Sequence, residues 1–135
     1  MTPFPLKIVT PDGLIYDGQA EEVIVRGTEG DLAILARHIN FVTPLGMGRA
    51  TIVANGQRRY AACIGGLLSV VDGAVTLVPT TFEWSDQIDA DRAEKSLHRA
   101  EGVLEKKDAS DAEIQLAEAR LKRALIRKSV ATRRF

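Results

Sequence analysis

The chain has few of the residues that disulfide, metal or redox chemistry requires. Its one cysteine, Cys63, cannot form an internal disulfide. Because Cys63 lies in the apolar run 60–64, a small buried hydrophobic residue is favoured over a reactive thiol. The two histidines, His38 and His98, do not combine with it in any spacing typical of structural zinc. We therefore expect no metal site.

Long apolar segments and an excess of one charge are also missing. No window approaches the roughly 18 uninterrupted apolar residues of a membrane-spanning helix, and residues 1–6 lack the features of a signal sequence. The 18 Lys and Arg residues balance 18 Asp and Glu residues, so no global charge favours nucleic acid or a membrane surface. These absences predict a soluble, reduced protein that is not exported.

Catalytic motifs are missing as well. The sequence has no nucleophile elbow and no Gly-rich phosphate loop followed by lysine, so we do not expect an enzyme. Its charge is nevertheless unevenly placed. Residues 1–83 hold six Lys or Arg and eight Asp or Glu, whereas residues 114–135 hold seven Lys or Arg and only Glu118. The C-terminal end is therefore basic.

Residues 4–78 read as short strands separated by turns at intervals of about ten residues, which is typical of a β-sandwich or barrel. Asn55-Gly56 and Asp72-Gly73 each separate two apolar runs and favour two-residue hairpin loops. The predicted strand pairs are 49–54 with 57–62 and 67–71 with 74–78. Gly65-Gly66 predicts a sharp bend between sheets. Further upstream, Gly27 and Gly30 predict a turn between two strands, followed by the mixed loop 37–40.

The composition shifts at Pro79, and we expect residues 80–84 to leave the sheet toward a helical half. Asp89 can cap a helix over 90–106, and Ser110 with Glu113 forms a capping-box pattern for a second helix over 111–127. The short connection predicts an antiparallel hairpin. Its alanine-rich seam would consist of Ala93, Leu97, Ala100 and Leu104 facing Ile114, Ala117, Leu121 and Ala124. Because alanine buries little area, such a hairpin should be marginally stable and mobile.

Several of these stretches resemble the epsilon subunit of bacterial F-type ATP synthases. The similar segments are 8–18, the turn and loop 29–38, 65–70 and the motif 88–93. The resemblance implies an α+β protein with two parts. Residues 1–84 would form an antiparallel β-sandwich that binds the central-stalk gamma subunit and the c-ring, and residues 85–135 would form a regulatory two-helix hairpin.

The resemblance also implies a function. The chain would be a non-catalytic rotor subunit that couples c-ring rotation to the alpha/beta catalytic head and inhibits ATP hydrolysis through its mobile hairpin. It would lie at the cytoplasmic side of the bacterial plasma membrane, held there only through the complex. The alternative is a free-standing ATP-sensing module with the same fold.

Interface residues are implied by the turn and the histidine loop, which meet gamma and the c-ring in this family. Glu29, Asp31 and His38 match that pattern. The chain departs from it beside the histidine. Ala36-Arg37 replaces the usual Pro-Gly, and Ile39-Asn40 replaces Ala-Pro.

A regulatory ATP site is implied by the 88–93 motif, and no other cofactor is expected. The candidate ligands are Asp89, Arg92, Arg99, Arg123 and Arg127, because a carboxylate can accept hydrogen bonds from adenine or ribose while arginines bind phosphates. The simpler interpretation is that Asp89 caps its helix and the arginines are solvated.

The basic second helix has three interpretations. By resemblance it would contact the acidic C-terminal region of the catalytic beta subunits through Arg120, Lys122, Arg123 and Arg127. A solvated face is an ordinary alternative. Nucleic acid binding is disfavoured, because the helix carries no aromatic stacking residues.

Overall fold

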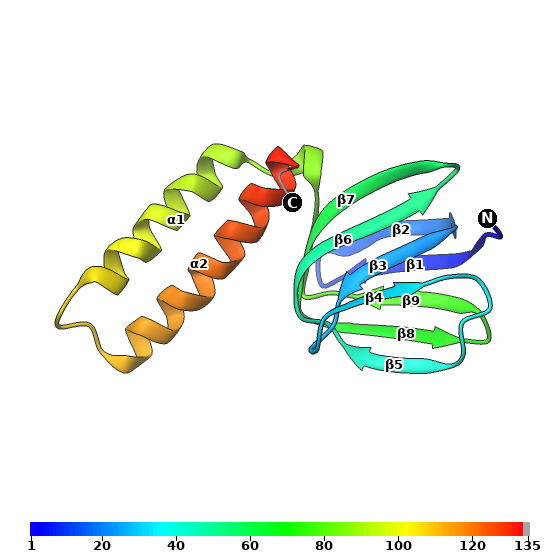
Figure 1. Ribbon diagram of the computed structural model, residues 1–135, viewed down its shortest axis with the longest axis horizontal. Helices are drawn as coiled ribbons and strands as arrows, with labels where there is room; N and C mark the ends of the chain where they lie inside the picture. Colours follow the sequence, from blue (N-terminus) through cyan, green and yellow to red (C-terminus); the bar gives the residue numbers. More distant parts are fainter. Residues whose placement is uncertain (134–135) are drawn as a thin grey trace. The chain divides into compact units, whose positions relative to one another are not determined.

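The computed structural model describes residues 1–133, which divide after Trp84 into two compact units (Figure 1). The first unit contains only strands, and the second contains a short 3-10 helix and two α-helices. The predicted α+β class is therefore confirmed.

Two five-stranded sheets form the sandwich. One has the strand order β2-β1-β9-β8-β5 and the other has the order β10-β7-β6-β3-β4. The strands of the first sheet are β1 (Phe4–Thr10), β2 (Gly13–Ala20), β5 (Phe41–Pro44), β8 (Leu67–Val71) and β9 (Ala74–Val78). Those of the second sheet are β3 (Glu22–Arg26), β4 (Asp31–Ile34), β6 (Met47–Ala54), β7 (Gln57–Ile64) and β10 (Thr81–Trp84).

The local turns follow from the sequence as predicted. Ala54 pairs with Gln57 across Asn55-Gly56, and Val71 pairs with Ala74 across the second loop. Asn55, Gly56, Asp72 and Gly73 all have positive φ angles, as two-residue hairpin loops of this hand require. Both predicted hairpins are confirmed.

Alternating side chains of the two sheets form the sandwich core. Leu6, Ile8, Val23, Val25 and Leu77 belong to one buried cluster and are essentially inaccessible to solvent. The chain crosses from β7 in one sheet to β8 in the other at Gly65-Gly66, where both φ angles are positive. A Cβ on Gly66 would lie only 2.0 Å from the Val78 carbonyl oxygen. This confirms the predicted sharp bend, which only glycine fits.

The prediction for the segment after Pro79 was wrong. Residues 81–84 do not leave the sheet but form β10, which pairs antiparallel with β7 from Thr81↔Ile64 to Trp84↔Ala61. Phe82 and Trp84 alternate with half-buried neighbours and belong to the core, and their rings meet edge to face with centroids 4.9 Å apart. The alternation of apolar and polar residues therefore describes this segment better than its position after Pro79 does.

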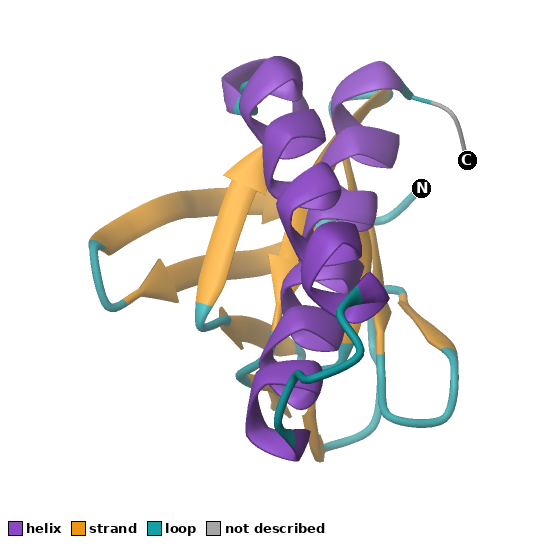
Figure 2. Ribbon diagram, turned by 90° about the vertical axis from the view of Figure 1, so that its left-hand side faces the viewer, coloured by secondary structure: helices purple, strands orange, loops and turns teal. Residues whose placement is uncertain are grey.

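The helical unit contains η1 (Ser85–Gln87), α1 (Ala90–Glu105) and α2 (Asp111–Thr132). Asp89 accepts a hydrogen bond from the Arg92 amide, and Ser110 with Glu113 makes a complete capping box. Figures 1 and 2 show α1 and α2 side by side, joined by one short loop. The predicted helical hairpin is confirmed, but its second helix is longer than predicted because it ends at Thr132 rather than near Arg127.

The seam between α1 and α2 is as thin as the sequence indicates. Ala93, Leu97 and Ala100 are buried on α1, and Ala117 and Ala124 are buried on α2. The other three predicted seam residues, Leu104, Ile114 and Leu121, are only half-buried. Small side chains let the helices approach closely but remove little apolar area from water.

Candidate functional site

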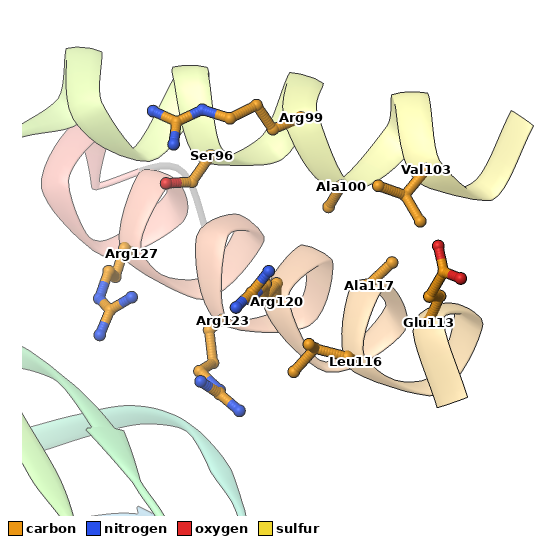
Figure 3. Close-up of a pocket in the computed structure, with 10 residues that line it drawn as sticks. All are labelled: Ser96, Arg99, Ala100, Val103, Glu113, Leu116, Ala117, Arg120, Arg123 and Arg127. Carbon is orange, nitrogen blue, oxygen red and sulfur yellow. The ribbon is translucent and has the colours of Figure 1, made fainter. Parts of the chain in front are cut away.

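The helical hairpin holds a pocket of about 640 Å³ on one flank. Its lining combines four arginines with one carboxylate and several apolar side chains: Ser96, Arg99, Ala100, Val103, Glu113, Leu116, Ala117, Arg120, Arg123 and Arg127. Figure 3 shows Arg99 coming from α1 and the other three arginines from α2, with Glu113 and Val103 toward the interhelical loop. A ligand at this place would touch both helices.

Two helical rows position these arginines. Ser96, Arg99 and Val103 lie three and four residues apart on α1, and Arg120, Arg123 and Arg127 have the same spacing on α2. Residues so spaced share one helix face. Both rows sit beside the buried alanine seam, which brings the helix backbones close enough for the rows to border a single groove.

Few carboxylates lie beside the positively charged guanidinium groups of this pocket. Within residues 1–133, Arg99, Arg120 and Arg123 have neither an ion-pair partner nor a hydrogen-bond acceptor. Arg127 does have a polar or charged interaction. Glu113 is the only carboxylate of the lining, and its Oε1 already accepts hydrogen bonds from Ser110 N and Oγ. The pocket is therefore an electropositive, anion-attracting site.

On the opposite flank of the hairpin, basic side chains are paired with carboxylates. Lys128 Nζ of α2 lies 2.7 Å from Glu94 Oε2 of α1, and His98 Nε2 lies 3.0 Å from Glu94 Oε1. His98 Nδ1 faces Glu101 at 3.5 Å. The hydrogen bond from Lys128 lowers the pKa of Glu94, with smaller contributions from the charges of Lys128 and His98. Positive charge is thus paired with carboxylates on this flank, whereas three arginines of the pocket flank, Arg99, Arg120 and Arg123, have no ion-pair partner within residues 1–133.

The predicted ATP ligands are only partly brought together. Arg99, Arg123 and Arg127 line the pocket, whereas Asp89 and Arg92 do not. The Asp89 carboxylate accepts the Arg92 backbone N–H at 3.0 Å, so it acts as a helix cap in this structure. Arg120, which was predicted for the beta-subunit contact and not for the ATP site, also lines this pocket. Its spacing of three and seven from Arg123 and Arg127 is the sequence signal that could have found it.

The four residues predicted to contact the beta subunit do not all lie on one face of the second helix. Arg120, Arg123 and Arg127 face the pocket, while Lys122 is exposed and is not part of the lining. Lys122 follows Arg120 by two residues, which places it on a different side of the helix.

A second, smaller pocket of about 350 Å³ lies at the β3–β4 turn of the sandwich. Glu29 and Asp31 line it, together with Phe41 of β5. The Gly27 amide donates to the Gly30 carbonyl oxygen at 2.7 Å, which closes the predicted turn. The Asp31 carboxylate lies 3.4 Å from Arg26 Nε in an exposed pair, which stabilises by less than about 1 kcal/mol.

His38 lies beside this turn rather than in its pocket. Its ring centroid is 5.8 Å from that of Phe41, and its Nδ1 lies 2.8 Å from the Ile39 carbonyl oxygen. Arg37 has a φ of 65°, in the left-handed region. A glycine at this place would adopt that conformation without strain, so the loop has a glycine-like backbone although arginine occupies the position.

Other chemistry is scarce in the described residues. Cys63 is buried, and burial raises the pKa of its thiol from 9.0 to about 12. Within residues 1–133, no three His, Cys, Asp or Glu side chains gather as metal ligands would. Neither α1 nor α2 combines the length and apolar character needed to cross a membrane.

Two known protein domains match this chain in succession. The beta-sandwich domain of the ATP synthase delta/epsilon chain matches residues 3–85, and the long alpha-helix domain of the same chain matches residues 86–132. The ATP synthase epsilon chain of Ruminococcus albus is 39% identical over 135 residues, 99% of this chain and 100% of that one. The ATP synthase epsilon chain of Bacillus velezensis is 42% identical over 126 residues, 93% and 95% of the two chains.

Solved structures share the fold at lower identity. A chain of the Euglena gracilis mitochondrial ATP synthase, in a structure of OSCP, F1 and c-ring, has a TM-score of 0.80 at 22% identity over 90% of this chain and 77% of that one. A chain of the Tetrahymena thermophila mitochondrial ATP synthase central stalk and c-ring has a TM-score of 0.66 at 14% identity, covering 94% and 95%. With both domains matched and close relatives aligned end to end, the chain belongs to the ATP synthase delta/epsilon family.

Proposed function

We propose that this chain is the epsilon subunit of a bacterial F-type ATP synthase, a non-catalytic part of the rotor. The observation that carries the proposal is the end-to-end match to bacterial proteins named ATP synthase epsilon chain. The absence of any catalytic motif in the sequence agrees with a mechanical role. Its work would be to couple c-ring rotation to the alpha/beta catalytic head.

The sandwich would bind the gamma subunit and the c-ring. The c-ring appears in the names of the two solved structures described above. Glu29 and Asp31 are exposed at the β3–β4 turn, and His38 lies in the neighbouring loop. We assign these three residues to the rotor interface. The subunit would be held at the cytoplasmic side of the bacterial plasma membrane through these contacts.

The hairpin would act as a brake with compact and extended states. Its seam supports this role, because the buried residues of α1 and α2 are largely alanines and contribute little hydrophobic stabilisation. An element of low stability can exchange between two arrangements. In the extended state, Arg120, Lys122, Arg123 and Arg127 would contact acidic beta-subunit surface.

ATP would favour the compact state by binding the arginine pocket. Arg99 of α1 and Arg123 and Arg127 of α2 would hold phosphate oxygens, so the ligand would bridge the two helices. The pocket also supports the second candidate function, a free-standing ATP sensor. Both functions use the same hairpin, and they differ only in whether the sandwich binds a stalk partner.

Co-purification with gamma separates the two functions. Stable assembly of this chain with the gamma subunit, weakened when Glu29, Asp31 and His38 are replaced together, supports the rotor subunit. Tight ATP binding without any gamma complex would support the sensor. Cross-linking α1 to α2 in the assembled enzyme should change the rate of ATP hydrolysis if the hairpin is a brake.

The role of Asp89 needs a matched pair of variants. Asp89→Asn keeps a good helix cap but loses the carboxylate, whereas Asp89→Ala loses both. If Asp89 only caps α1, calorimetric titration with ATP gives parent-like affinity for Asp89→Asn and reduced helicity for Asp89→Ala. If the carboxylate recognises adenine or ribose, ATP affinity falls in both variants.

A further inference from the structure

We propose that Asn55 is a site of spontaneous deamidation, in which the Gly56 backbone nitrogen is the nucleophile, and that a hydrogen bond from this nitrogen to Glu21 limits the rate in the folded protein. Asparagine is one of the residues that proteins lose most readily to chemical change on heating. The inference does not depend on the functions proposed above. It concerns a covalent modification of the loop between β6 and β7.

The β6–β7 loop has the sequence that this reaction favours. Asn55 is followed by Gly56, which has no side chain to shield its amide nitrogen. Both residues are exposed, and a Cβ on Gly56 would meet nothing within 4 Å. The reacting groups are therefore open to solvent and free of steric cover.

The reaction needs only water as a co-reactant. The Gly56 nitrogen loses its proton and forms a bond to the Asn55 side-chain carbonyl carbon. The side-chain nitrogen takes up a proton and leaves as ammonia, so that a five-membered succinimide ring remains. Water then opens the ring at one of its two carbonyl carbons. One opening gives aspartate, and the other gives isoaspartate, in which the backbone runs through the former side-chain carbon.

Glu21 restrains the nucleophile in the folded protein. The Gly56 N–H donates to Glu21 Oε1 at 2.9 Å, and the Glu21 N–H donates to the Val53 carbonyl oxygen at 2.6 Å. Attack requires the Gly56 peptide group to turn toward the Asn55 side chain, which breaks its hydrogen bond to a charged acceptor. Proton removal by Glu21 does not offset this loss, because a carboxylate is a weak base toward an amide N–H.

Conversion of Asn55 should destabilise the hairpin. Either product adds a carboxylate to the loop whose Gly56 amide binds Glu21, and like charges at close range repel. Isoaspartate also lengthens the backbone of a two-residue turn, and the length of that turn fixes the pairing of Ala54 with Gln57. The modified chain should therefore lose stability in the sheet that contains β6 and β7.

The other asparagine of the chain, Asn40, provides an internal comparison. The bulky residue Phe41 follows it, so the nitrogen that would attack is sterically shielded. The Asn40 side chain is also engaged, because its Oδ1 accepts the Asp72 N–H at 2.8 Å. We expect Asn40 to stay unmodified under conditions in which Asn55 reacts.

The test is prolonged incubation of the full chain in mildly alkaline buffer, followed by peptide mass spectrometry that separates asparagine, aspartate and isoaspartate. In the folded parent, conversion should be slow at Asn55 and absent at Asn40. Glu21→Ala removes the acceptor and should speed conversion of Asn55 about tenfold, the factor that corresponds to one charge-assisted hydrogen bond. Glu21→Gln keeps an acceptor oxygen and should stay closer to the parent.

Glu22→Ala is the matched control. Glu22 is the adjacent carboxylate, and it pairs with Arg58 at 3.9 Å rather than with the loop amide. Because such a pair contributes little to stability, the conversion rate of Asn55 should stay within about twofold of the parent. Circular dichroism checks that each variant is folded.

Incubation in guanidinium chloride separates the effect of folding from that of sequence. Glu21 lies 35 residues from Gly56 along the chain, so it approaches the loop only in the folded state. All variants should therefore convert Asn55 at the same rate once they are unfolded. A rate difference that persists in the denaturant would contradict restraint by the folded hydrogen bond.

Four further outcomes would overturn the proposal. No conversion in folded Glu21→Ala, while the unfolded chain converts fully, would show that the folded loop does not react. Equal rates in the folded parent and Glu21→Ala would show that Glu21 does not limit the reaction. Slower conversion in both Glu21 variants would make the carboxylate an accelerating base. Equal acceleration in Glu22→Ala would indicate general loosening of the sheet.

Discussion

Lys128 Nζ of α2 lies 2.7 Å from Glu94 Oε2 of α1, so one ion pair joins the two helices across their alanine seam. The pair lowers the pKa of Glu94, and it stabilises the compact hairpin only while that carboxyl is ionised. Stabilisation is therefore present above the ordinary glutamate pKa of about 4.3 and is lost as the pH falls through the lower pKa of the folded state.

Replacing Lys128 should move that titration. In Lys128→Gln the pKa of Glu94 should rise toward its ordinary value, because its strongest hydrogen bond is gone. NMR titration of the Glu94 carboxyl measures the change, and thermal unfolding of parent and variant should converge in acid. Lys122→Gln, an exposed cation of the same helix, should leave the pKa of Glu94 in place. An unchanged value in Lys128→Gln would show that the pair does not persist in solution.

Gly66→Ala should unfold the sandwich at moderate temperature. The new Cβ would lie 2.0 Å from the Val78 carbonyl oxygen and 2.6 Å from Pro79 Cα, and φ at this residue is 96°. Backbone atoms on both sides cannot move without breaking the sheet crossing, so we expect a loss of about 3 kcal/mol or more in the free energy of unfolding. Urea unfolding followed by circular dichroism measures it.

Gly73→Ala separates the two causes of that loss. Gly73 also has a positive φ, 82°, but a Cβ there would meet nothing within 4 Å. Its substitution should cost only the backbone strain, about 1 to 2 kcal/mol. Equal losses at Gly66 and Gly73 would mean that steric contact at the crossing is relieved at little cost.

Arg37→Gly should stabilise the sandwich. Arg37 holds a φ of 65°, a conformation that costs a side chain about 1 to 2 kcal/mol and costs glycine nothing. Glycine also lowers the free energy of unfolding by about 0.5 to 1 kcal/mol, because it increases the conformational entropy of the unfolded chain. The free energy of unfolding should therefore rise by a net amount of about 0.5 kcal/mol. Arg37→Ala keeps the Cβ and should show no gain. A gain in Arg37→Ala instead would point to the arginine side chain as the source of instability.

Cys63 should be inert in the folded protein. Because burial raises the pKa of its thiol to about 12, almost no thiolate forms at pH 8, and a thiol reagent should react only after denaturation. The folded pKa lies above the value of 9.0 in the absence of burial. Stability from this group is thus complete below pH 9 and declines as the pH rises toward 12. Rapid labelling under native conditions would contradict the buried position.

Local chemistry explains which parts of the fold were predictable. Asn55-Gly56 and Asp72-Gly73 specify their hairpins through backbone preferences alone, and Ser110 with Glu113 specifies the start of α2. The strand β10 was missed because the composition change at Pro79 outweighed the alternation of Phe82 and Trp84. The end of α2 was missed because no glycine marks it, and Arg133 takes the left-handed cap position instead.

The sequence predicted that arginines would form the candidate site, but not which basic residues would line it. Arg99, Arg123 and Arg127 were expected near a phosphate, but only the packing of α1 against α2 determines which basic residues face one groove. Arg120 faces that groove, and Lys122, two residues away, does not. The helix register is set by the alanine seam, which the sequence predicts only approximately, because three of its predicted residues, Leu104, Ile114 and Leu121, are half-buried.

The parallel pairing of β1 with β9 has a consequence for how the protein is made. Leu6 lies opposite Val75, so β1 becomes an interior strand of its sheet only after β9, which lies about 65 residues further along the chain, has been synthesised. Until then, β1 can pair only with its neighbour β2, because its other partner strand has not been made. Contacts between such distant segments slow folding and expose strand edges to other chains. The β1–β9 pairing is therefore a long-range contact whose formation slows the folding of this sheet.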